Sequence, residues 1–120
     1  MDPVRFKERV TVLLGEVAFL GPQFDAIVQK LSDDAVRTII TWLQTITERK
    51  ERALLPTHGS QYKSVPTGDL LVFRKELSIE GKAMRILLVK IKNAQYWEFH
   101  LGKHAYYDEV SEQLQLRRSS

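Results

Sequence analysis

The sequence predicts an α+β fold in which N-terminal helices pack on a small twisted antiparallel β-sheet. Two observations predict it. In the first half, apolar residues recur every three to four positions, as they do along one face of a helix. In the second half, apolar and polar residues alternate in runs that turn residues separate, as in strands with one buried face. A sheet of this kind needs a cover on its apolar face, and the helices supply it.

Length and composition narrow the class of protein. The 120 residues suit one domain, which we expect to span the whole chain. Hydrophobic residues make up 43% and charged residues 28%, which is typical of a globular protein. The absence of cysteine excludes disulfides and thiol chemistry. No apolar run is long enough to span a membrane and no secretory signal is evident, so we expect a cytoplasmic protein without a membrane partner.

The helical half divides into three expected segments. The first 22 residues are expected to form an additional N-terminal helix over residues 3–20, which Gly21 and Pro22 end. A short second segment places the apolar residues of 24–31 on one face. Ser32 then offers an N-cap hydroxyl to the longest helix, expected over about residues 33–52.

The second half begins with a long loop and continues as strands. Residues 53–69 are rich in Pro, Gly and Ser and carry His58 and Lys63. Loops of this length are often functional. Three antiparallel strands are expected to follow, at 70–77, 83–92 and 95–101. The polar tail, 113–120, is expected to be flexible.

Charge is distributed unevenly along the chain. The net charge is +3, but residues 1–48 carry −2 and residues 49–120 carry +5. A basic half favours a polyanionic partner, with nucleic acid as the first candidate. The alternative is a soluble surface that is simply uneven, with lysines that protect strand edges from pairing. The basic residues expected on strands or strand ends are Arg74, Lys75, Arg85, Lys90, Lys92, Lys103 and His104.

The segment His100–Val110 holds the highest density of chemically active side chains. It contains two His, one Lys, two Tyr and two acidic residues. Cleavage of RNA by its own 2′-hydroxyl requires a proton donor or acceptor, stabilisation of phosphate charge, and a held base. Histidine, lysine and tyrosine supply these three functions. The alternative is a strand end with tyrosines packed at the rim of the sheet.

Other chemistries find less support in the sequence. His100 and His104 have a spacing of four, but no carboxylate pair or cysteine completes a metal site. No serine lies in a Gly-x-Ser-x-Gly elbow, and there is no phosphate loop or dinucleotide fingerprint. We therefore expect neither a metal nor a cofactor.

The residues Leu101-Gly-Lys-His-Ala-Tyr-Tyr-Asp-Glu-Val110 resemble the C-terminal signature of HigB-type toxins of the RelE/ParE superfamily, which belong to type II toxin–antitoxin systems. Lys103 replaces the usual threonine, and His104 stands where RelE itself has a catalytic arginine. The runs Gly68–Arg74 and Met84–Leu87 are similar to two strands of the family, and the resemblance covers about residues 23–112. The matching signature positions are Gly102, His104, Ala105, Tyr107, Asp108 and Val110.

This resemblance implies a RelE-like fold and a metal-independent endoribonuclease. Such toxins cleave mRNA, usually on the ribosome, and a cognate antitoxin neutralises them. The family usually opens with a β-strand, where this sequence predicts a helix. By the resemblance, His104 is the general acid or base, Arg85 stabilises the scissile phosphate, Lys103 and Arg74 hold the backbone, and Tyr107 orients or stacks on the substrate. Further RNA contacts are predicted for the remaining basic residues of the loop and the strands, which are His58, Lys63, Lys75, Lys90 and Lys92.

Two other function classes stay open at this point. One is a non-catalytic nucleic-acid-binding protein on the same fold, which would bind RNA with steep salt dependence and without cleavage. The other is a protein-interaction module that uses its helical face, with Val36, Ile40 and Trp42 as contacts.

Overall fold

The computed structural model describes residues 1–50, 53, 61–92, 94, 96–114 and 116. Helix α1 (Pro3–Leu14) is followed by strand β1 (Val17–Leu20), helix α2 (Phe24–Gln29) and helix α3 (Asp33–Thr47). A short hairpin, β2 (Gln61–Tyr62) and β3 (Val65–Pro66), leads through a 3₁₀ turn (Thr67–Asp69) to strands β4 (Leu70–Ile79), β5 (Lys82–Ile91) and β6 (Tyr96–Lys103). Helix α4 (His104–Leu114) comes last. The predicted α+β class is confirmed.

The main sheet has the strand order β1-β6-β5-β4. The predicted antiparallel meander of three strands is confirmed: Leu70 pairs with Ile91 across β4 and β5, and Met84 pairs with Lys103 across β5 and β6. The prediction of a wholly antiparallel sheet is wrong, because β1 pairs with β6 in parallel, from Val17 opposite Trp97 onward. The sheet is therefore mixed.

The N-terminal segment corrects a second expectation. It is not one helix to residue 20, because α1 ends at Leu14 and the chain turns at Gly15, whose φ is 90°. Residues 17–20 are a short, wholly apolar run, and such a run fits a strand or a helix equally well by periodicity. Residues 17–20 form a strand because they pair with β6. Gly15 supplies the positive φ that the preceding turn requires.

The predicted N-cap is confirmed at Ser32, whose Oγ accepts a hydrogen bond from the Ala35 amide at 3.1 Å. Helix α1 has a cap that was not predicted, because the Asp2 side chain accepts a hydrogen bond from the Val4 amide at 3.0 Å. Helix α3 ends at Thr47, five residues before its expected end. Arg49 adopts a φ of 60°, which is incompatible with a continuing right-handed helix.

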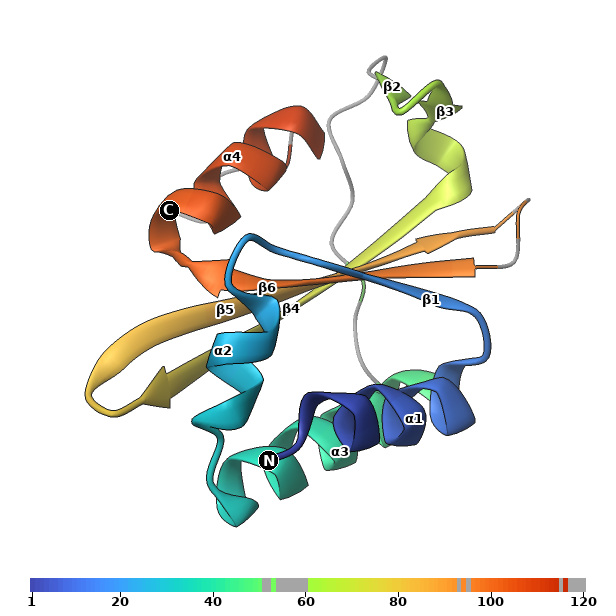
Figure 1. The fold of residues 1–120 in the computed structure, drawn as a ribbon. Coiled ribbons are helices and arrows are strands. Elements are labelled where there is room, and N and C mark those ends of the chain that lie inside the picture. The colour runs from blue at the N-terminus through green and yellow to red at the C-terminus, as the bar shows by residue number, and fades with distance from the viewer. Residues whose placement is uncertain (51–52, 54–60, 93, 95, 115, 117–120) are drawn as a thin grey trace.

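The sheet is covered on both faces rather than on one (Figure 1). Helices α1, α2 and α3 pack on the first face around an aromatic group that includes Phe6, Phe24 and Phe99. Helix α4 and the β2–β3 hairpin cover part of the second face, which holds its own core, including Leu87, Val89 and Tyr107. The expectation of one covered and one solvated face is therefore wrong.

The second face is covered because the C-terminal segment is a helix packed on the sheet. Gln113 and Leu114, expected in a flexible tail, belong to α4, and Leu114 is buried. Its burial on the sheet stabilises a helix that would be marginal in isolation. Residues 115 and 117–120 lie outside the described residues. No helix among those that the structure describes combines the length and apolar character needed to cross a membrane.

Candidate functional site

Helix α4 starts directly at the end of β6, and Gly102 makes this junction possible. A Cβ atom at Gly102 would lie 2.7 Å from Cδ2 of Tyr106, so a residue with a side chain would force the two apart. Gly102 also stands opposite Arg85 in the sheet. The first turn of α4 is thereby brought over the part of the second face that carries Arg85.

Tyr107 is the centre of the resulting cluster. Its hydroxyl accepts a hydrogen bond from Arg74 Nη1 at 3.2 Å, and the Arg85 guanidinium lies over its ring at 4.6 Å from the centroid. The His104 ring stacks against the Tyr107 ring at 6.3 Å between centroids and 26° between planes. Four side chains predicted from sequence therefore meet here: Arg74 from β4, Arg85 from β5, and His104 and Tyr107 from α4. We call them the Tyr107 cluster.

Two carboxylates complete the electrostatics of the Tyr107 cluster. Glu76 Oε1 lies 3.3 Å from Arg85 Nη2, and Asp108 Oδ2 lies 3.5 Å from His104 Nε2. The hydrogen bond to Tyr107 raises the pKa of Arg74 and fixes its guanidinium in place. The positive end of the α4 dipole lies at the same point. The cluster thus presents two arginine forks and an exposed imidazole at a helix N-terminus, a combination that suits a phosphate group.

Neither carboxylate was assigned a role from the sequence. Asp108 follows His104 by four residues, which is the spacing of neighbours on a helix face. This signal was available but depends on recognising residues 104–114 as a helix. Glu76 and Arg85 are cross-strand partners, a relation that follows only from the register of β4 and β5.

The other lysines predicted to bind RNA do not join the Tyr107 cluster. Because successive strand residues point to opposite faces, Lys75 and Lys90 lie on the face of α1–α3. The Lys90 ammonium lies 5.2 Å from the centroid of the Trp97 ring. Lys92 lies past the end of β5, where its amide donates to the Asp69 carbonyl oxygen. His58 lies outside the described residues.

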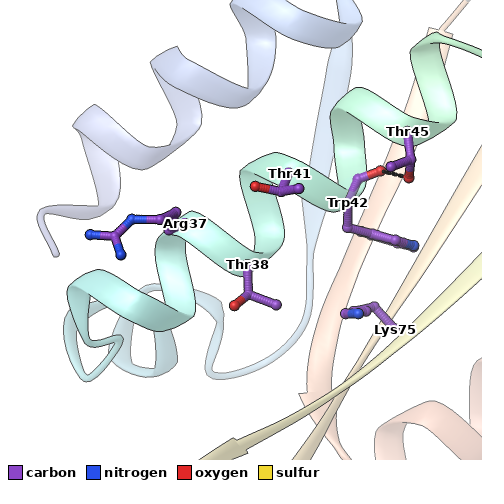
Figure 2. Close-up of a pocket in the computed structure, with 6 residues that line it drawn as sticks. All are labelled: Arg37, Thr38, Thr41, Trp42, Thr45 and Lys75. Carbon is purple, nitrogen blue, oxygen red and sulfur yellow. Dashed lines mark hydrogen bonds between the residues drawn. The ribbon is translucent and has the colours of Figure 1, made fainter.

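Lys75 instead lines a groove of about 370 Å³ between α3 and strand β4 at the edge of the sheet. Figure 2 shows it opposite Trp42, with Arg37 and three threonines of α3 along the other wall. Trp42 is buried, and its indole Nε1 has no hydrogen-bond partner within the described part of the chain.

Lys103, predicted to act with His104, also lies on the α1–α3 side. It lines a small cavity at the end of the sheet together with residues of α2 and of the β4–β5 hairpin. Alternation along β6 separates it from Gly102, its neighbour in the chain, which faces Tyr106.

A buried polar network that the sequence did not predict lies beside the Tyr107 cluster. Glu98 and His100 of β6 are 2% and 4% exposed, although their alternation with Trp97 and Phe99 suggested a solvated face. Glu98 Oε1 accepts a hydrogen bond from the Tyr62 hydroxyl at 2.7 Å and lies 3.1 Å from His100 Nε2. Lys63, a predicted RNA contact, forms an ion pair with Glu98 Oε2 at 2.8 Å.

The network ties three elements together and shifts several pKa values. His100 Nδ1 lies 2.7 Å from the Tyr106 hydroxyl, so the network links the β2–β3 hairpin, β6 and α4. Burial by itself would raise the pKa of Glu98. Its hydrogen bonds with His100, Lys63 and Tyr62 outweigh burial and hold that pKa at about 2. Burial, followed by the hydrogen bond to Glu98, raises the pKa of the Tyr62 phenol.

The chain matches no protein-family model, no curated protein and no solved structure in the three comparisons made. The Tyr107 cluster and the buried network therefore provide the observations on which function is argued.

Proposed function

We propose that this protein is a metal-independent endoribonuclease of the RelE/HigB type, which cleaves mRNA by activating the RNA 2′-hydroxyl. The observation that carries this proposal is the Tyr107 cluster. Within it, an exposed imidazole and two guanidinium groups stand around one aromatic ring. An acid or base, a charge stabiliser and an aromatic surface are what this reaction requires.

In the proposed reaction, the 2′-oxygen attacks the adjacent phosphorus and the bond from phosphorus to the 5′-oxygen breaks. The products are a 2′,3′-cyclic phosphate and a 5′-hydroxyl. Neutral His104 takes the 2′-hydroxyl proton while a water molecule protonates the leaving 5′-oxygen, or protonated His104 supplies the proton to the 5′-oxygen while water takes the one from the 2′-hydroxyl. Arg85 and Arg74 stabilise the charge that gathers on the phosphate oxygens, and Asp108 orients the imidazole.

The topology supports a RelE-like fold. The resemblance implies an opening strand, two helices and a small sheet, and β1, α2, α3 and the strands β4–β6 follow in that order. Helix α1 is then an addition before the opening strand. By the same proposal, the partners are mRNA on the ribosome and a neutralising antitoxin in the cytoplasm.

The test is cleavage of a defined mRNA, mapped by primer extension after induction of the protein in cells and repeated with purified protein in EDTA. His104→Ala and Arg85→Ala should each reduce the cleavage rate by about 10²-fold or more. Arg5→Ala is a matched control, because Arg5 is an exposed arginine on α1, across the sheet from the Tyr107 cluster. It should cleave as the wild type does.

Two results would count against the proposal. If induced wild-type protein leaves cellular mRNA intact, the endoribonuclease activity is refuted. If the purified protein binds RNA with steep salt dependence and never cleaves it, the fold is used for nucleic-acid binding alone.

A further inference from the structure

We propose that a groove at the end of the sheet, lined by Lys30, Lys82 and Lys103, holds backbone phosphates of the RNA strand beyond the scissile position. This inference rests on the proposed function and extends it to a second binding surface. The three lysines line one small cavity of about 60 Å³. We call this surface the lysine groove.

The fold brings the three lysines together from distant parts of the chain. Lys30 follows α2, Lys82 opens β5 and Lys103 closes β6. The link between β1 and α2 lies directly against β6, since a Cβ atom at Gly21 would clash with the Leu101 carbonyl oxygen. This close backbone contact fixes α2, and with it Lys30, at the end of the sheet.

The lysine groove carries an excess of positive charge. Within the described part of the chain, Lys30, Lys82 and Lys103 form no ion pair, whereas other lysines, such as Lys7 and Lys63, do. Among the described residues that line the cavity, Glu80 is the one acidic side chain. Three ammonium groups beside one carboxylate leave a positive surface that an external anion can neutralise.

The lysine groove and the Tyr107 cluster are built from neighbouring residues of the chain. Lys103 directly precedes His104, and its cross-strand partner Met84 directly precedes Arg85. The two sites therefore lie on opposite faces of the same end of the sheet, joined around the turn from β6 into α4. A single strand with its scissile phosphate at Arg85 reaches the lysine groove by passing around this turn.

The chemistry of the lysine groove favours backbone phosphate over a base or a planar carboxylate. Lysine binds phosphate as a compact point charge without the fork geometry of arginine. Each phosphate that a lysine neutralises on a single strand adds about 0.7 to the slope of log K against log salt concentration. Three such contacts account for a slope of about 2.

The experiment measures binding of 2′-O-methyl RNA, which lacks the nucleophile, by fluorescence anisotropy from about 50 to about 200 mM KCl. Two oligonucleotides are compared, one of about three nucleotides and one of about twelve. The variant is Lys30→Gln/Lys82→Gln/Lys103→Gln. For the longer RNA, we expect the magnitude of the slope of log K against log salt concentration to be smaller than that of the wild type by about 2. For the shorter RNA, which fills only the Tyr107 cluster, binding should equal that of the wild type.

The matched control is Arg5→Gln/Arg9→Gln/Arg49→Gln, which removes the same charge from exposed positions outside both sites that have no predicted RNA contact. It should leave the salt slope for the longer RNA within about 0.5 of the wild-type value. If the two triple variants bind the longer RNA equally, the lysine groove is refuted while the proposed function stands. If the wild type binds neither RNA, the proposed function fails and the groove fails with it.

Discussion

At the scale of single residues, Gly102 sets the distance between α4 and the sheet. The Tyr106 ring occupies the space where a Cβ atom at Gly102 would lie, and its hydroxyl is held by His100 Nδ1 at 2.7 Å. The ring therefore cannot swing away without breaking this partly buried hydrogen bond. Because His104 and Tyr107 belong to the same helical turn, their position over Arg85 depends on this close contact.

Gly102→Ala is expected to lower the free energy of unfolding by about 1–3 kcal/mol, the usual cost of forcing extra volume into a packed site. It should also weaken RNA cleavage, because α4 is displaced from Arg85. Urea unfolding and cleavage assays on the same preparation measure both effects. Gly68→Ala serves as the control, since no atom lies within 4 Å of the Cβ position there. Equal stability of the two variants would contradict the role assigned to Gly102.

At the scale of elements, α4 contributes His104 and Tyr107 from its first turn, whereas Leu114 at its C-terminal end packs on the sheet. Its apolar residues Tyr107, Val110 and Leu114 recur at helical spacing and pack on the second face of the sheet. Leu114, at 1% exposure, anchors the last turn. The helix that positions His104 therefore depends on a residue ten positions away.

Leu114→Ala is expected to destabilise the protein by about 2–5 kcal/mol, the range for deleting a buried leucine side chain. Hydrogen exchange should show faster exchange along α4 than along α1, because α1 packs on the opposite face. Gln113→Ala, an exposed position in the same turn, should leave both measurements unchanged. A Leu114→Ala variant as stable as the wild type would show that α4 is anchored elsewhere.

At the scale of the whole molecule, the buried network couples stability to pH. The folded pKa of Glu98 is about 2, below its ordinary value of 4.5. A carboxylate with a depressed folded pKa contributes stability fully above its unfolded pKa and loses it as the pH falls toward the folded one. A shift of this size corresponds to about 3 kcal/mol. This contribution is present at neutral pH and disappears between about pH 4.5 and pH 2.

Glu98→Gln is therefore expected to unfold at lower urea concentration at pH 7 and to lose much of the wild-type decline between pH 5 and pH 2. Denaturant titrations at a series of pH values measure this directly. Glu76→Gln, at an exposed carboxylate of β4, should keep the wild-type pH dependence. If Glu98→Gln follows the wild-type curve throughout, the network does not stabilise the fold through this carboxylate.

The sequence by itself determined the α+β class, the helix starts at Pro3 and Asp33, the three-strand meander and the concentration of basic residues in the second half. These features follow from local signals: periodicity, capping and turn residues. His104 and Tyr107 were also identified from local sequence, since both lie in one dense run of His, Lys and Tyr residues at positions 100–107.

Only the tertiary structure decided which side chains meet. Strand alternation predicts that the side chains of neighbours such as Arg74 and Lys75 point to opposite faces of the sheet. It does not predict which of the two faces a distant helix covers. The docking of α4 brought Arg74 and Arg85 to Tyr107 and buried Glu98. Parallel pairing of β1 with β6 is equally non-local, since it joins residues about 80 positions apart. Contacts of this kind depend on packing between elements, which no local pattern in the sequence records.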